Sequence, residues 1–146
     1  MTTTVIPDRL LMSETDWQER LRELTSLTDG WFDGEGLAMK PDMCEAAWKL
    51  CQKVNDEGFL RPGIFPTPEG GLQLEWPIAY GNEYREIIVF ALEPDLTYEM
   101  HRTKVRERSY DEFSTPFLCA AIAKLNEWFK EFEASKDTDI DTSEAG

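Results

Sequence analysis

Side chains that could carry out chemistry are few in this sequence. It contains one histidine, His101, and three cysteines, Cys44, Cys51 and Cys119. A cysteine beside a histidine can act as a nucleophile, but Cys119 falls on the apolar side of an amphipathic helical pattern, where we expect it to pack in the core. The cysteines and His101 also lack the short ligand spacings of a zinc site. We therefore predict no catalytic residue, no metal site and no cofactor.

A glycine-rich segment over residues 29–36 brings three acids together, namely Asp29, Asp33 and Glu35. It lacks the alternating acids and the distal glutamate of a calcium-binding loop, so a structural role is favoured over a cation site. The glycines allow left-handed turns. Trp31, within the same segment, is expected to fill the core between the first two helices.

Basic residues occupy every second position of one segment, at Arg102, Lys104, Arg106 and Arg108. If the segment is extended, all four side chains lie on one face, because a strand has a period of two. Three explanations are open. The bases could protect an edge strand from aggregation, pair internally with the acidic tail or the helices, or bind an anionic partner.

The segment from Pro66 to Gly71 has the sequence Pro-Thr-Pro-Glu-Gly-Gly, which predicts a stiff hairpin turn. Turn formation alone explains this composition. A rigid loop is also suited to recognition, because it loses little conformational freedom on binding. The candidate partner-binding residues are therefore the alternating bases and the side chains of the two loops: Arg102, Lys104, Arg106, Arg108, Trp31, Asp33, Glu35 and Glu69.

The spacing of apolar residues predicts an α+β domain that positions these side chains. The domain is expected over residues 13–134, between a flexible arm over 1–12 and a disordered acidic tail over 135–146. Two helices come first, over about 14–27 and 41–57, because apolar residues recur there at helical spacing and a proline opens the second helix.

The middle of the chain changes from helical to strand periodicity. Leu72 and Leu74 alternate with polar residues, and the segments 83–92 and 97–108 are also typical of strands. We therefore predict an antiparallel meander of three or four strands, with helices packed on one face. A C-terminal amphipathic helix is predicted to begin near Pro116.

Length and composition limit the function. The chain has 146 residues, 41% of them hydrophobic, which suits one domain with a proper core. Lys+Arg 15 against Asp+Glu 29 gives a net charge of −14. Such a chain repels phosphates and anionic lipids, so we expect neither direct nucleic-acid binding nor membrane binding. Because no signal-peptide pattern, long apolar segment or paired-cysteine motif occurs, a cytoplasmic location is expected.

Two segments together resemble a family. They are Gly30-Trp-Phe-Asp-Gly-Glu-Gly36 and Pro66-Thr-Pro-Glu-Gly-Gly-Leu-Gln-Leu-Glu-Trp76. The pair resembles small uncharacterised proteins of bacteria and mobile elements that have a Gly-Trp-x-Gly-x-Gly loop and a Pro-Thr-Pro-x-Gly-Gly-x-x-Leu-x-Trp hairpin. The resemblance covers residues 28–100, with Phe32 inserted after the tryptophan. It implies the fold and a bacterial or phage setting, and it carries no activity, cofactor or catalytic residue.

Three hypotheses for function follow. The first is a non-catalytic interaction protein, an adaptor, inhibitor or antitoxin-like module, whose protein partner is expected to be basic. The second is an inhibitor that mimics nucleic acid and blocks a DNA- or RNA-binding defence protein. The third is a small-ligand binder or enzyme with a pocket between sheet and helices, lined by Trp31, Asp33, Glu35, Glu75 and Trp76. The sequence indicates no oligomeric state.

Overall fold

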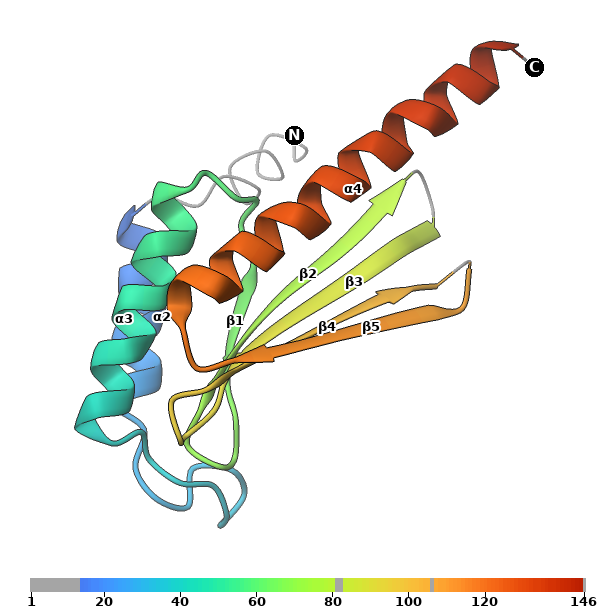
Figure 1. Cartoon of the computed structure of the whole chain (residues 1–146). Coiled ribbons are helices and arrows are strands. Elements are labelled where there is room, and N and C mark those ends of the chain that lie inside the picture. The colour runs from blue at the N-terminus through green and yellow to red at the C-terminus, as the bar shows by residue number, and fades with distance from the viewer. Residues whose placement is uncertain (1–13, 81–82, 106, 146) are drawn as a thin grey trace, which may run out of the picture.

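The computed structural model describes residues 14–80, 83–105 and 107–145, and it is an α+β fold (Figure 1). This confirms the predicted fold class. The expected arm over residues 1–12 lies outside the described residues. The described elements follow the chain in this order: α2 (Glu14–Thr25), α3 (Pro41–Asp56), β1 (Gly63–Pro66), β2 (Leu72–Tyr80), β3 (Glu83–Leu92), β4 (Tyr98–Lys104), β5 (Ser109–Thr115) and α4 (Leu118–Ala145).

The strands form one antiparallel sheet in sequence order, β1-β2-β3-β4-β5. The predicted count of three or four strands is therefore wrong, since there are five. The segment 97–108 was expected to be a single strand, but β4 ends at Lys104 and β5 begins at Ser109. The chain turns between them, and Arg108 has a positive φ of 55°. In the sequence, bases recur at every second position beyond the end of β4, so the pattern does not show where the strand ends.

Side chains from one face of the sheet form the core with the described helices (Figure 1). This inner face is built from alternate residues of neighbouring strands, such as Leu74, Phe90 and Met100, which lie opposite one another in register. All three are fully buried. The alternation predicted from Leu72 and Leu74 therefore gives the buried face correctly.

The two N-terminal helices pack against each other through aromatic rings. Trp17 of α2 and Trp48 of α3 have ring centroids 4.9 Å apart. Helix α4 contributes a separate stripe, whose buried members are Ala121, Ile122, Leu125 and Trp128. The order of helix, helix, sheet and helix thus encloses one core, because all of these residues belong to the same buried cluster.

Helix α4 differs from prediction in its length and in its buried face. The segment 135–146 was expected to be a disordered tail, yet the helix continues as far as Ala145. Backbone hydrogen bonds within a helix need no apolar stripe, so loss of that stripe did not mark the end of the element. Cys119 was expected in the core, but its side chain is exposed, because the buried stripe begins at Ala121.

The assignment of the buried face of α4 can be tested by substitution. Leu125→Ala should lower the free energy of unfolding by about 2–5 kcal/mol, because Leu125 is fully buried and the change leaves a cavity. Cys119→Ser on the exposed side of the same helix should change it by less than about 0.5 kcal/mol. Urea unfolding followed by tryptophan fluorescence measures both. A large loss in Cys119→Ser would contradict this orientation of α4.

Candidate interaction surfaces

The alternating bases do not form one stripe. Arg102 and Lys104 belong to β4, whereas Arg108 lies in the turn before β5. Arg106 lies outside the described residues. A period of two holds only within a strand, so the predicted single face of four bases is wrong.

Arg102 is buried, with 5% of its surface exposed. Its guanidinium donates hydrogen bonds from Nε and Nη2 to Oδ2 of Asp111, at 3.1 and 2.6 Å. Nη1 donates to Oε1 of Glu131 at 2.7 Å. The guanidinium also lies 5.0 Å from the ring centroid of Trp128. Arg102 therefore joins β4, β5 and α4, so it pairs internally and is not a surface residue for a partner.

Glu86 of β3 lies on the same inner face and is 5% exposed. Neither of its carboxylate oxygens accepts a hydrogen bond from the described residues. Burial raises the pKa of this carboxyl, as do the charges of Glu107 and Glu131, while Arg102 and Lys104 lower it. Burial is the largest of these effects, so the protonated form of Glu86 is favoured in the folded state.

The glycine-rich loop is held together by its own hydrogen bonds. Oδ1 of Asp29 accepts a hydrogen bond from the backbone N–H of Ala38 at 2.9 Å. The indole Nε1 of Trp31 donates to the carbonyl of Leu37 at 3.0 Å. Gly36 has a φ of 90°, and a Cβ there would lie 2.9 Å from that Nε1. Trp31 thus packs on its own loop and not between the first two helices, where the Trp17–Trp48 pair lies instead.

The same loop contacts the β1–β2 turn. The backbone N–H of Leu37 donates to the carbonyl of Pro68 at 2.8 Å. Gly70 has a φ of 92°, and a Cβ there would lie 3.3 Å from the carbonyl oxygen of Ala38. The loop that carries Asp33 and Glu35 therefore lies at the same end of the molecule as the turn that carries Glu69 (Figure 1).

All three of those acids are exposed: Asp33, Glu35 and Glu69. The β3–β4 turn adds further carboxylates at this end. Burial raises the pKa of Glu93, and the negative charges of Glu99, Glu69 and Asp95 raise it further, in that order. The β1–β2 and β3–β4 turns lie side by side, because a Cβ at Gly71 would lie 2.5 Å from the carbonyl oxygen of Leu92 and 3.5 Å from Cδ of Pro94. Glu69, Glu93 and Asp95 on these turns and Glu99 near the start of β4 therefore gather at one end of the sheet as one acidic cluster.

The sequence pattern predicts only Glu69 of this cluster as a binding residue. The Glu-Pro-Asp turn marks a second acidic turn in the sequence. Nothing local, however, places that turn beside the turn between β1 and β2. The strand register does so.

The opposite, outer face of the sheet is not covered by the described helices. Residues between the buried positions point to this face; Glu75 and Val89 lie opposite each other on it. Trp76 points instead to the core, where its Nε1 donates to the carbonyl of Leu60 at 2.6 Å. Because Glu75 and Trp76 lie on opposite faces of β2, they cannot line one pocket, and the five residues expected around a catalytic pocket do not gather.

The cysteines and the histidine are also separated. His101 lies on the outer face, opposite Val89 in register, whereas Cys51 is buried in α3 and Cys119 is exposed on α4. Burial raises the pKa of Cys51 to about 12, so its thiol remains protonated at neutral pH. Among the described residues, no three or more His, Cys, Asp or Glu side chains gather to hold a metal ion.

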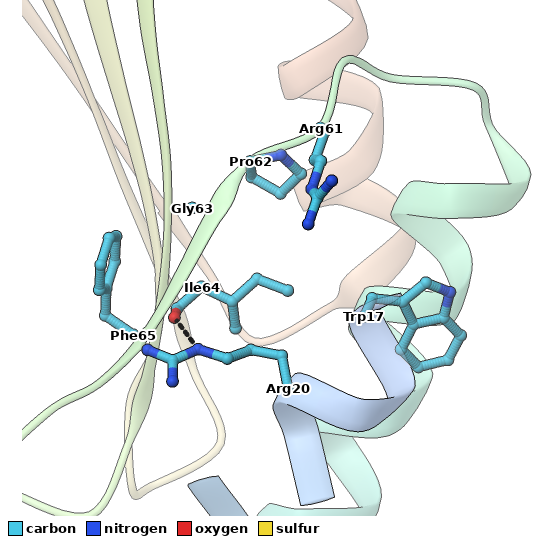
Figure 2. A pocket seen from close by; sticks show the side chains of 7 residues that line it. All are labelled: Trp17, Arg20, Arg61, Pro62, Gly63, Ile64 and Phe65. Carbon is cyan, nitrogen blue, oxygen red and sulfur yellow. Dashed lines mark hydrogen bonds between the residues drawn. The ribbon is translucent and has the colours of Figure 1, made fainter. Parts of the chain in front are cut away.

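A hollow of about 300 Å³ lies between α2 and the edge strand β1 (Figure 2). Its lining includes Trp17, Arg20, Arg61 and Ile64. Nε of Arg20 donates to the carbonyl of Ile64 at 2.9 Å, as drawn in Figure 2. This bond occupies a backbone acceptor of the edge strand, and an added strand would need such acceptors. Arg20 therefore helps to protect this edge from pairing with another chain.

No protein-family model, no curated protein and no solved structure matches the chain. Within the described residues, no helix combines the length and apolar character that crossing a membrane requires. The resemblance to small bacterial and mobile-element proteins therefore shows no family, and a function has to be argued from the residues themselves.

The buried carboxyl of Glu86 predicts a specific pH dependence. Its pKa is raised in the folded state from the ordinary value of 4.5, so its favourable contribution is complete below that value and is lost as pH rises through the raised pKa. Glu86→Gln should therefore raise the free energy of unfolding at pH 7, and the gain should disappear toward pH 4. Urea unfolding at several pH values, with exposed Glu19→Gln as control, measures this. A gain that is the same at all pH values would refute the titration of Glu86.

The edge contact of Arg20 gives a second prediction. Arg20→Met keeps much of the aliphatic side chain but removes the donor to the Ile64 carbonyl. The variant should self-associate more than the wild type, because the edge strand then offers a free acceptor. Sedimentation velocity over a range of concentrations measures the change. Glu23→Gln removes the charge of the carboxylate that Arg20 contacts at 3.1 Å, and it should leave self-association unchanged.

Proposed function

We propose that the protein is a non-catalytic interaction module that binds a basic protein partner through its acidic cluster. The observation that carries the proposal is that the β1–β2 and β3–β4 turns lie side by side, which brings Glu69, Glu93, Asp95 and Glu99 to one end of the sheet. Like charges at short range repel one another, and this repulsion contributes to the raised pKa of Glu93. A cationic partner relieves the repulsion on binding, which favours the complex.

The surroundings of the cluster support a recognition role. Gly70 holds the β1–β2 turn in a left-handed conformation against the glycine-rich loop, so Glu69 is carried on a braced turn. Asp95 accepts hydrogen bonds from the backbone N–H and the hydroxyl of Thr97, at 3.1 and 2.6 Å. Carboxylates on such turns lose little freedom on binding, so more of the electrostatic attraction is retained as affinity.

An adaptor, an inhibitor and an antitoxin-like module all fit this proposal, in the bacterial or phage setting that the resemblance implies. The described cysteines are free thiols, in keeping with a cytoplasmic location. Mimicry of nucleic acid is a special case in which the basic partner uses the same site for DNA or RNA.

The proposal is tested by recovering the partner from the native host at low and high salt. We expect a basic protein that is retained at low salt and held more weakly near 1 M salt, where the Debye length falls to about 3 Å. The pair Glu69→Gln and Glu93→Gln should weaken its binding by roughly three- to tenfold, since exposed pairs contribute about 0–1 kcal/mol each.

The matched control removes two exposed acids from the helices, with Glu19→Gln and Asp56→Asn. It has the same net charge as the test variant and should bind as the wild type does. Failure to recover any partner at either salt concentration would contradict the proposed function. Displacement of the protein by excess duplex DNA would identify nucleic-acid mimicry, and simultaneous binding of DNA and this protein would exclude it.

A further inference from the structure

The central strand β3 has a sequence typical of a strand covered on both faces. From Ile87 to Leu92 its residues are Ile-Ile-Val-Phe-Ala-Leu, without a polar interruption. An antiparallel strand with one solvent face normally alternates apolar and polar residues, as β2 does from Leu72 to Trp76. In the structure, Ile88, Phe90 and Leu92 fill the core. Their neighbours on the other face receive no cover from the described helices.

Those neighbours form an apolar column along the middle of the outer face. The column consists of Ile87, Val89 and Ala91, which alternate with the core residues of β3. Ala91 is 7% exposed, and the other two are half-buried by the strands around them. Because β3 is third in the order of five strands, the column lies at the centre of the face.

Acidic residues flank this column on both sides. Glu75 of β2 lies opposite Val89, and Glu99 of β4 lies opposite Ala91. Glu112 of β5 lies one strand further out, opposite His101. Among the described side chains of the outer face there is no lysine or arginine. The outer face therefore combines an apolar centre with negative flanks.

Large aromatic side chains occur toward both edges of the face. Phe65 of β1 is 42% exposed, and Figure 2 shows it on the side of the strand away from Ile64 and α2. Tyr110 of β5 is 56% exposed and stacks on His101 with ring centroids 5.6 Å apart. Exposed aromatic residues beside an apolar patch are typical of binding surfaces.

We infer that this outer face is the docking surface for a basic amphipathic helix of a protein partner. Neighbouring strands lie about 4.8 Å apart, so the columns of β2 and β4 are separated by about 10 Å across β3. That distance matches the diameter of an α-helix with its side chains, about 10–12 Å. A helix along β3 would place its apolar stripe on Ile87 and Val89, with lysine or arginine on its flanks near Glu75 and Glu99.

The charges favour this occupant over a second copy of the chain. Two outer faces packed together would bring glutamates such as Glu75, Glu99 and Glu112 near their own kind, which costs free energy in a water-excluded interface. The inference rests on the proposed function in that the partner is basic. It adds that the partner also provides an apolar stripe, so binding should survive high salt in part.

The test uses a fluorescently labelled helical peptide with a leucine stripe and lysines on its flanks, and an acidic version with glutamate in place of lysine. Fluorescence anisotropy with the full chain should show binding of the basic peptide only. The double variant Ile87→Thr and Val89→Thr keeps β-branched residues in the strand and should weaken binding by about tenfold or more. Phe117→Ser removes an exposed apolar residue elsewhere and should have no effect.

A second comparison tests the flanking charges. The pair Glu75→Gln and Glu99→Gln should weaken binding of the basic peptide. The control pair Glu19→Gln and Asp56→Asn should not. Circular dichroism of each variant verifies that it is folded. Equal binding of the basic peptide to the Ile87→Thr and Val89→Thr variant would overturn the outer face as the site. The proposed function would survive that result, because the acidic cluster would remain as the site.

Two further outcomes identify a different occupant and overturn the inference. If removal of residues 1–12 is required before the peptide binds, the chain's own N-terminal segment covers the face. If sedimentation shows a dimer that the Ile87→Thr and Val89→Thr variant loses, a second copy covers it. Absence of binding to both the basic peptide and any basic host protein would contradict the proposed function itself.

Discussion

A five-stranded sheet has two faces, and the described helices of this protein cover only one of them. Side chains alternate between the two faces along each strand. Because Phe90 lies on the inner face, its neighbours Val89 and Ala91 lie on the outer face. The apolar side chains of the inner face are buried in one core with Trp17, Leu125 and their neighbours. The residues at the intervening positions of each strand lie on the outer face. In β3 these positions are apolar, so this strand has apolar side chains on both faces of the sheet.

The inner face also has a polar end, where α4 crosses β4 and β5. Burial of Arg102 is tolerated because Asp111 and Glu131 accept its hydrogen bonds and Trp128 lies against its guanidinium. Removal of one partner would leave a buried charge incompletely paired, which costs more than the pair contributes. This contact fixes the position of α4 over the sheet.

Local patterns predicted much of this fold and little of the acidic cluster. The spacing of Leu72 and Leu74 gave the buried face of β2, and helical spacing gave α2, α3 and the start of α4. Three features were not predicted. The turn at Arg108 interrupts a period that continues in the sequence, and Trp31 found its contacts within its own loop. Glu93 and Glu69 are 24 positions apart in the sequence, and only the register of the intervening strands brings their charges together.

The acids around the outer face also oppose the packing of two apolar columns against each other. Ile87 and Val89 alone would favour stacking of one sheet on another, but Glu75, Glu99 and Glu112 oppose the approach of a like-charged copy. Arg20 occupies an acceptor on the β1 edge and opposes pairing there. Glu99 belongs both to the outer face and to the acidic cluster, so the two surfaces are continuous. In the proposed complex, the same carboxylates that oppose the approach of a second copy would favour a partner with the opposite charge.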